Sequence, residues 1–131
     1  MTDAVVDTHS LIWFLQDSPK LGKEANKIFE ACDHGKATIH IPTICLVEIV
    51  YLQERARIPE DLLIQLKAEL QASNFVFADL TSGVVDELAQ ISRREVSDMP
   101  DRIIAATALH LRLPLISRDR KIQLSAVNTI W

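Results

Sequence analysis

The residues best suited to do chemistry are four acids, each at the end of a predicted strand or beside a predicted core face: Asp7, Glu48, Asp101 and Asp119. A carboxylate that is removed from water loses its charge unless a cation or hydrogen-bond donors compensate it. Several carboxylates at one place repel one another, and Mg²⁺ or Mn²⁺ relieves that repulsion because these ions prefer oxygen ligands. Such an ion can activate a water and neutralise charge on a phosphodiester. If the four acids meet, the sequence predicts metal-assisted phosphodiester chemistry.

Asp7 and Asp119 each follow a short apolar run that is typical of a buried strand. Val5-Val6 precedes Asp7 directly, and residues 115–116 come shortly before Asp119. In open α/β sheets, ligands bind just outside the carboxyl ends of the strands, so both acids lie where a site is expected. A turn acid such as Asp119 is also common for structural reasons alone. Its position therefore indicates a site only in combination with Asp7.

Glu48 lies inside a predicted helix among apolar neighbours. The residues four before, three after and four after it are Ile44, Tyr51 and Leu52. These positions share one face of a helix, which places Glu48 on or beside the stripe that faces the core. The alternative is that Glu48 lies at the edge of the stripe and pairs with Arg55 or reaches water.

Asp101 begins a predicted helix that includes the small residues 105–108. Small side chains let this helix approach the sheet closely, which would bring its first turn near the strand ends. An acid in the first turn is also favoured by the helix dipole, so Asp101 has an ordinary structural explanation as well. Asp98 has a similar one, because an N-cap Asp with Pro100 in the first turn is a typical helix start.

The elements that must position these acids alternate along the chain. Predicted strands cover residues 5–6, 38–41, 75–78, 114–117 and 127–131, and predicted helices cover 10–16, 21–33, 43–57, 59–74, 82–91 and 101–111, with one further turn at 119–124. Strands that alternate with helices indicate βαβ units and a parallel sheet covered on both faces. We therefore expect a three-layer α/β/α sandwich with a central, mostly parallel sheet, and the length favours a single domain over residues 1–131.

The charge of the chain excludes little. The formal net charge is −4, from 18 acids and 14 Lys and Arg residues, which argues against a general nucleic-acid binder. However, acids that hold a metal do not repel a polyanion, and the basic residues are concentrated in the last third of the chain. The composition therefore permits a polyanionic substrate without demanding one.

No targeting signal is apparent. The N-terminal residues lack a basic and an apolar region, and no apolar run approaches the ~18 residues that a membrane span needs. We expect no membrane contact and a cytoplasmic location. Cys32 and Cys45 are the only cysteines and have no zinc-site spacing, so they are interpreted as reduced thiols.

Five motifs occur in order along the chain: Val5-Val6-Asp7-Thr8-His9 with Leu11-Ile12-Trp13, Pro42-Thr43 leading to Glu48, Asp98-Met99-Pro100-Asp101-Arg102 with residues 104–108, Ile116-Ser117-Arg118-Asp119, and Ile130-Trp131. Each motif alone is weakly specific, but the ordered set is quite specific and spans essentially the whole chain. Together the motifs resemble the PIN domain, and most closely the VapC-type toxins of type II toxin–antitoxin pairs.

The resemblance implies a Rossmann-like fold and a Mg²⁺- or Mn²⁺-dependent endoribonuclease that hydrolyses RNA with a metal-activated water. The family's catalytic, metal-binding acids map onto Asp7, Glu48, Asp101 and Asp119, with Asp98 as an accessory ligand. Two accessory hydroxyls accompany them. Ser117 would hydrogen-bond a carboxylate or a water on the metal, and Thr8 directly follows the first acid.

The resemblance also implies partners. These are an RNA substrate such as transfer or ribosomal RNA, a small cognate antitoxin protein and a second copy of the chain in a homodimer. Three arginines are candidates for substrate binding: Arg94, Arg102 and Arg118. The charged segment 93–97 departs from the compact lead-in usual before the third acid, and a solvated loop is the alternative for it. His9 is interpreted as a structural histidine, and Trp13 and Trp131 as core or dimer contacts.

Other function classes fit less well. A phosphatase of the haloacid dehalogenase type needs a second Asp two residues after the first, where this chain has His9. A receiver domain of a signalling pathway needs paired acids near the first strand, and no such pair follows here. A PIN-like module that has lost catalysis and only binds a partner is the remaining alternative, although every expected acid is present.

Overall fold

A computed structural model describes residues 3–123 and 125–131 of the chain. The sheet has five strands, which are β1 (Ala4–Val6), β2 (Ile39–Pro42), β3 (Phe75–Ala78), β4 (Leu115–Ile116) and β5 (Thr129–Ile130). They lie in the order β3-β2-β1-β4-β5, and every neighbouring pair is parallel. The predicted parallel sheet is therefore confirmed.

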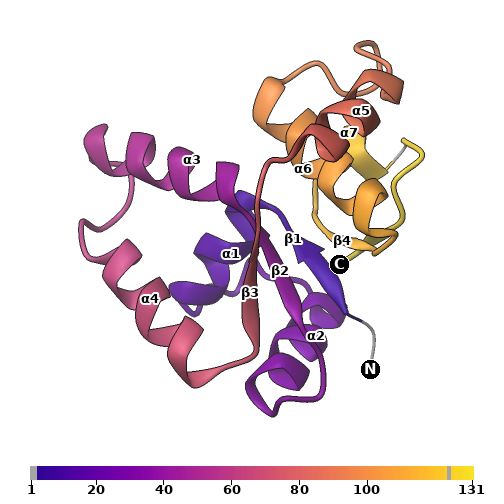
Figure 1. Ribbon diagram of the computed structural model, residues 1–131. Coiled ribbons are helices and arrows are strands. Elements are labelled where there is room, and N and C mark those ends of the chain that lie inside the picture. The colour runs from indigo at the N-terminus through magenta and orange to yellow at the C-terminus, as the bar shows by residue number, and fades with distance from the viewer. Residues whose placement is uncertain (1–2, 124) are drawn as a thin grey trace.

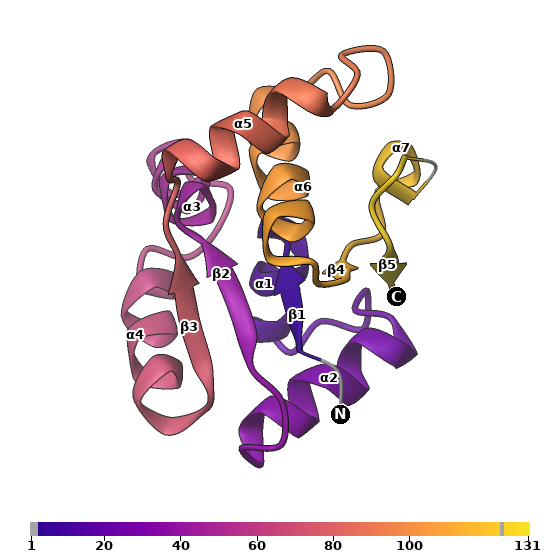
Figure 2. The ribbon, with the colours of Figure 1, turned by 45° about the vertical axis from the view of Figure 1, so that its right-hand side comes forward.

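Helices cover both faces of this sheet (Figure 1). They are α1 (Thr8–Leu15), α2 (Lys23–Asp33), α3 (Thr43–Glu54), α4 (Leu62–Ala72), α5 (Ser82–Gln90), α6 (Met99–Leu111) and the single turn α7 (Arg120–Gln123). Helix α6 packs on β1 and β2 and against α5, whereas α1 and α4 pack together on the other side of the strands (Figure 2). This arrangement is the expected three-layer α/β/α sandwich.

The order of the strands reverses between β1 and β4. The chain leaves β1 toward β2 and later returns to the opposite side of β1 as β4. The registers Val5 with Leu115 and Val6 with Ile116 place the carboxyl ends of both strands side by side. Ligands in open α/β sheets bind at such a switch point. The two strands that carry predicted acids at their ends therefore open onto one place.

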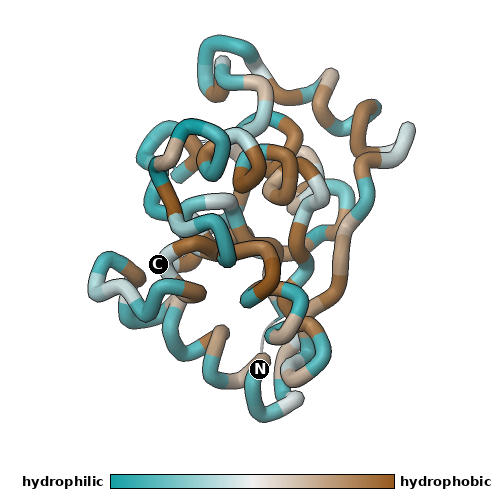
Figure 3. The backbone as a smooth tube through the Cα atoms, turned by 90° about the vertical axis from the view of Figure 1, so that its left-hand side faces the viewer, coloured by the Kyte–Doolittle hydropathy of each residue, from teal (hydrophilic) through white to brown (hydrophobic). Residues whose placement is uncertain are grey.

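The core forms where the apolar strands meet α6. Strand β1 is fully buried, and so are Ala105, Ala106 and Ala108 on α6. Their small side chains let α6 lie close to the sheet, as the sequence predicts. The hydrophobic segments run through the middle of the molecule, and many of the connecting segments are hydrophilic (Figure 3).

Several predicted boundaries change. The helix expected from Pro59 begins at Leu62, because residues 59–61 form a turn whose carbonyls at Pro59 and Glu60 accept hydrogen bonds from Gln53. The strand expected over 127–131 is only Thr129–Ile130. The helical turn expected at 119–124 is Arg120–Gln123, and Leu124 lies outside the described residues.

The predicted core face of α3 is wrong. Tyr51 was expected to face the core, but it is 58% exposed, and the buried residues of this helix are Cys45 and Ile49. The reason is that α3 is apolar on nearly all sides, so the spacing of its apolar residues does not select one face. Within the described residues, no helix is both long and apolar enough to cross a membrane.

Candidate active site

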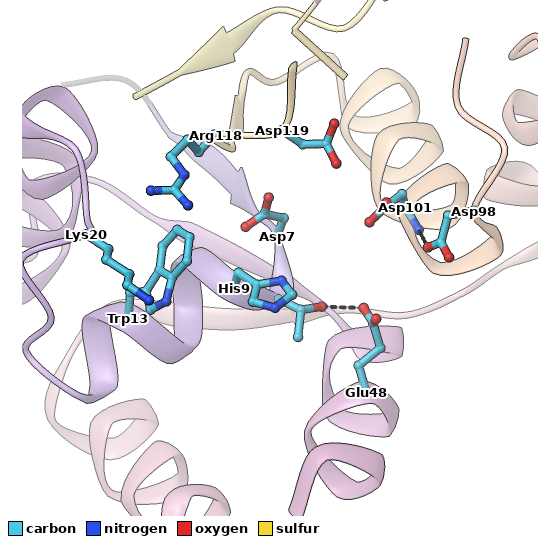
Figure 4. A pocket seen from close by; sticks show the side chains of 10 residues that line it. Asp7, His9, Trp13, Lys20, Glu48, Asp98, Asp101, Arg118 and Asp119 are labelled. Atoms are coloured by element: carbon cyan, nitrogen blue, oxygen red, sulfur yellow. Dashed lines mark hydrogen bonds between the residues drawn. The ribbon is translucent and has the colours of Figure 1, made fainter. Parts of the chain in front are cut away.

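A pocket of about 640 Å³ opens at the carboxyl ends of β1 and β4 (Figure 4). It is lined by Asp7, Thr8, His9, Trp13, Lys20, Glu48, Asp98, Asp101, Arg118 and Asp119. All four acids singled out from the sequence are present, together with Asp98. We call these five carboxylates the acid wall. Their convergence, which spacing alone could only suggest, is therefore observed.

Asp7 is held by both the sheet and the helix that follows it. Its backbone amide donates to the carbonyl of Ile116 on β4 at 3.2 Å. Its carboxylate caps α1 by accepting the amide of Ser10 at 2.9 Å, and the residue is only 9% exposed. The hydroxyl of Ser10 in turn donates to the same carbonyl of Ile116 at 3.3 Å. The position of this carboxylate is therefore fixed by backbone geometry.

Glu48 reaches the pocket from the first half of α3. The Oγ1 of Thr8 donates to Glu48 Oε1 at 2.5 Å, which is the clearest role for a predicted accessory hydroxyl. Burial raises the pKa of Glu48 above its ordinary value, and the hydrogen bond from Thr8 opposes that rise. The alternative pairing with Arg55 is wrong, because the ion pair found in the described part of the chain joins Lys27 to Glu24.

Asp98 and Asp101 come from the start of α6. Asp98 is the N-cap of this helix and accepts the amide of Asp101 at 3.2 Å, so its predicted capping role is confirmed while its side chain also lines the pocket. Burial, together with the charges of Asp98, Asp119, Glu48 and Asp7, raises the pKa of Asp101 to about 7. Repulsion from the neighbouring carboxylates therefore contributes to the raised pKa of Asp101.

Asp119 is oriented by the turn after β4. The buried Oγ of Ser117 accepts the amide of Asp119 at 3.1 Å. The Oδ1 of Asp119 accepts the amides of Lys121 at 2.8 Å and Ile122 at 3.3 Å. Ser117 was expected to bind a carboxylate or a ligand of the metal, but its hydroxyl is enclosed behind the strand end. It therefore positions the backbone of Asp119 instead.

The donor set of the acid wall suits a hard divalent cation. All five side chains offer carboxylate oxygens, which are the ligands that Mg²⁺ and Mn²⁺ prefer. Burial is the main cause of the raised pKa values of Asp101 and Glu48, and the charges of neighbouring carboxylates add to both. Among the described residues, no three potential ligands stand close enough to hold one ion as they are. The acid wall therefore fits such an ion in the chemistry of its oxygen donors.

The opposite side of the pocket is aromatic and basic. The guanidinium carbon of Arg118 lies 4.7 Å from the ring centroid of Trp13, and the Nζ of Lys20 lies 5.9 Å from it. We call Trp13, Lys20 and Arg118 the cationic wall. Figure 4 shows Asp7 between this wall and the carboxylates of α6. The ring of exposed His9 lies 5.7 Å from that of Trp13.

One interpretation of a single residue changes as a result, since His9 was expected to be a structural histidine but lines the pocket. Trp13 packs against the core, as predicted, and also lines the pocket. The side chain of His9 is exposed, although its neighbours Thr8 and Ser10 on α1 are buried. No motif points to Lys20, which follows Pro19 in an exposed loop and reaches the pocket only through the path of that loop.

The three arginines predicted to bind substrate lie in different environments. Arg118 lines the pocket, whereas Arg102 does not. The Nη2 of Arg102 donates to the carbonyls of Leu88 and Ile91 at 3.1 Å each, so this side chain ties the end of α5 to α6 and the prediction for Arg102 is corrected. Arg94 is exposed and lies outside the pocket lining, so its predicted contact with substrate stays a prediction.

A second, smaller groove of about 190 Å³ adjoins the first. It shares three members of the acid wall, Asp98, Asp101 and Asp119, with the main pocket. Its remaining lining residues are Val96, Ser97, Arg120 and Lys121. Basic side chains therefore occur on two sides of the carboxylates.

Comparisons with known proteins agree with this geometry. A family model described as the PIN domain matches residues 4–127, a range that contains the acid wall from Asp7 to Asp119. Among curated proteins, ribonuclease VapC22 of Mycobacterium tuberculosis is 26% identical over 125 residues, which is 94% of this chain and 92% of that protein.

Two solved structures share the fold over almost their whole length. One is VapBC2 from Rickettsia felis bound to a DNA fragment from its promoter, with a TM-score of 0.73, 17% identity, and coverage of 98% of this chain and 96% of that one. The other is a toxin–antitoxin complex from Klebsiella pneumoniae, with a TM-score of 0.64, 22% identity, and coverage of 98% and 97%. At these identities the likeness concerns the fold, and it confirms the expected Rossmann-like sandwich.

Proposed function

We propose, from the premise that this chain belongs to the PIN domain family, that it is a metal-dependent endoribonuclease and the VapC-type toxin of a toxin–antitoxin pair. The observation that carries the proposal is the meeting of five carboxylates in one pocket at the switch point of the sheet. The curated relative is named a ribonuclease, which supports RNA as the substrate class. Transfer RNA, ribosomal RNA and a cytoplasmic location stay predictions.

The acids Asp7, Glu48, Asp101 and Asp119 would hold Mg²⁺ or Mn²⁺, with Asp98 as an accessory ligand. When bound, such an ion lowers the pKa of a water and neutralises charge on the phosphodiester. The chain's own residues orient the ligands. Ser10 fixes the carboxylate of Asp7, Thr8 fixes that of Glu48, and the turn after β4 fixes that of Asp119. Outer contacts of this kind set the geometry of metal ligands and tune their basicity.

A protein partner is part of the same proposal. Helix α3 exposes Val47, Val50 and Tyr51, and α4 exposes Ile64, which is 72% accessible. Adjacent exposed apolar side chains of this kind mark protein interaction sites. The two solved neighbours are a VapBC complex and a toxin–antitoxin complex, which supports an antitoxin as the partner. The homodimer stays a prediction.

The test is cleavage of a mixed pool of transfer and ribosomal RNA by the purified chain, with Mg²⁺, with Mn²⁺ and with EDTA. An Asp7→Asn protein purified in the same way is the control, because it keeps the cap of α1 while it weakens the acid wall. Metal-dependent cuts at defined positions that are absent from the control support the proposal. A wild-type chain that binds Mg²⁺ in a titration but never cuts differently from the control would be an inactive binding module.

A further inference from the structure

Two cations share a pocket with five carboxylates and pair with none of them. Lys20 and Arg118 are both exposed and line the main pocket. In residues 3–123 and 125–131, no carboxylate lies within ion-pair distance of either one. An ion pair with a carboxylate would neutralise each charge. Without one, both side chains are available to bind an anionic group of a ligand. A phosphate is the anion that fits the proposed substrate.

Arg118 is held in place by an aromatic stack rather than by an acid. Its guanidinium lies over the ring of Trp13, a geometry in which the cation is attracted by the face of the indole. Trp13 is itself wedged edge-on against Trp131, with ring centroids 5.8 Å apart. The carbonyl of Trp131 accepts the amide of Glu24 at 3.1 Å. The stack therefore places the guanidinium of Arg118 over Trp13 at the pocket.

Gly22 shows how tightly this stack is built. A Cβ at position 22 would lie 2.6 Å from the Cδ1 of Trp131 and 2.7 Å from its backbone carbonyl carbon. Only a glycine allows Trp131 to approach so closely, and Trp131 in turn supports Trp13. Gly22 thus contacts Trp131, Trp131 contacts Trp13, and Trp13 contacts Arg118.

Arg120 and Lys121 supply positive charge on the other side of the acids. Both are exposed and line the smaller groove, which meets the main pocket along Asp98, Asp101 and Asp119. The two depressions therefore form one path, with cations at each end and the acid wall between them. A single phosphate would occupy only part of a path of this size.

We propose that an RNA strand crosses the acid wall with phosphates held on both sides of the scissile one. The cationic wall holds the phosphate on one side, and Arg120 and Lys121 hold the phosphate on the other. Trp13 is a positioning residue that acts through Arg118. This inference rests on the proposed function and deepens it. It makes the substrate an internal stretch of chain and predicts that isolated phosphodiesters are bound weakly.

The first test compares alanine variants at Lys20, Arg118, Arg120 and Lys121 on a short single-stranded RNA and on a dinucleoside monophosphate, which has no flanking phosphate. On the RNA, we expect each substitution to raise KM by about tenfold with little change in kcat, because a charge-assisted contact is lost. The slope of log KM against log salt concentration should become shallower by about 0.7 for each phosphate contact removed. On the dinucleoside monophosphate, the same variants should raise KM by a much smaller factor than they do on the RNA.

The matched control is Arg57→Ala, which removes an exposed arginine that does not line either depression. It should leave KM and the salt slope unchanged on both substrates. Equal losses for Arg57→Ala and Arg118→Ala would mean that only net charge matters, and would overturn the inference. So would alanine variants that keep wild-type KM and salt slope on RNA but lose affinity for polyglutamate, since the cations would then serve an acidic protein.

The second test asks whether Trp13 works through Arg118. Trp13→Leu should raise KM on RNA by the same factor as Arg118→Ala, and the double variant should be no worse than Arg118→Ala alone. Fully additive effects would mean that Trp13 contacts the substrate independently. Arg118→Lys retains the charge and should recover part of the salt slope. Because Arg118 is exposed, its variants are expected to fold even if Trp13→Leu does not.

Failure of the proposed function looks different from failure of this inference. If the wild type cuts no RNA, the nuclease proposal fails, and the strand path is then tested by fluorescence anisotropy of a labelled single-stranded RNA with Mg²⁺ present. The four alanine variants should each weaken binding relative to Arg57→Ala. If the wild type cuts RNA but the variants bind and cut it equally well, only the strand path is wrong.

Discussion

The two walls of the main pocket are built in different ways. The acid wall is fixed mainly by backbone geometry, since Asp7 and Asp98 cap helices and Asp119 sits in a turn that follows a strand. The cationic wall is fixed by side chains, in a stack that joins Trp13 to Trp131 and carries Arg118. A wall fixed by the backbone keeps its shape when one side chain changes, whereas a stack depends on each of its members. Single substitutions should therefore separate chemistry from substrate placement.

The largest expected effect is on the acid wall. Substituting a residue that only supports a metal ligand lowers activity by about 10–100-fold. Asp101→Asn should lower kcat on RNA by more than this, because it removes a proposed ligand directly. The fold should persist and even gain stability without metal, since the variant removes a charge that its neighbours repel. Steady-state cleavage and thermal melting would measure both effects. An active Asp101→Asn chain would show that the acid wall does not work as proposed.

The support of Glu48 should have the next largest effect. Thr8→Val keeps the shape of the side chain but removes the donor to Glu48, and should lower activity by about tenfold or more. The pKa of Glu48 should rise further, because the bond from Thr8 is what opposes the effect of burial. The pH profile of kcat/KM should therefore move to higher pH. Thr8→Ser restores the hydroxyl and should restore the profile, whereas failure of that rescue would point to packing.

A change of pH should affect stability through Asp101 of the acid wall. Asp101 has a pKa of about 7 in the folded chain and a much lower ordinary value of 3.8, so the folded state binds the proton more tightly. Stability from this group is complete below pH 3.8 and is lost as the pH rises through about 7. Without divalent cation, the melting temperature should thus fall over this window, and Mg²⁺ should reduce the fall. Asp101→Asn should show a smaller fall, and an identical curve for the variant would contradict the assignment.

The smallest expected effect concerns Arg94. Its side chain is exposed and lies in neither wall, so Arg94→Ala should change KM on RNA far less than Arg118→Ala does. The comparison needs only initial rates at several RNA concentrations. An equal rise in KM for both variants would extend the RNA path to the loop before α6, and would restore the role that the sequence predicts for Arg94.

The same contrast explains what sequence could and could not predict. Asp7, Asp98 and Asp119 follow from strand ends and helix caps, which are local patterns. The parallel sheet follows from the alternation of elements, and even Glu48 is found from its apolar neighbours, although the face assigned to α3 was wrong. In contrast, nothing local places Lys20 beside Trp13, because they meet only when a loop folds back. Arg102 was misassigned because its partners, the carbonyls of Leu88 and Ile91, belong to a different helix end.

The stack beneath Arg118 also determines what light spectroscopy can report. Trp13 and Trp131 are the two tryptophans of the chain, and both belong to this stack. Tryptophan fluorescence excited at the red edge of protein absorption therefore comes from the cationic side of the pocket. It responds little to changes at the acid wall. The single tyrosine, Tyr51, is exposed on α3, on the apolar surface proposed for a protein partner. Indole emission should therefore report ligands that bind beside Trp13, without any label.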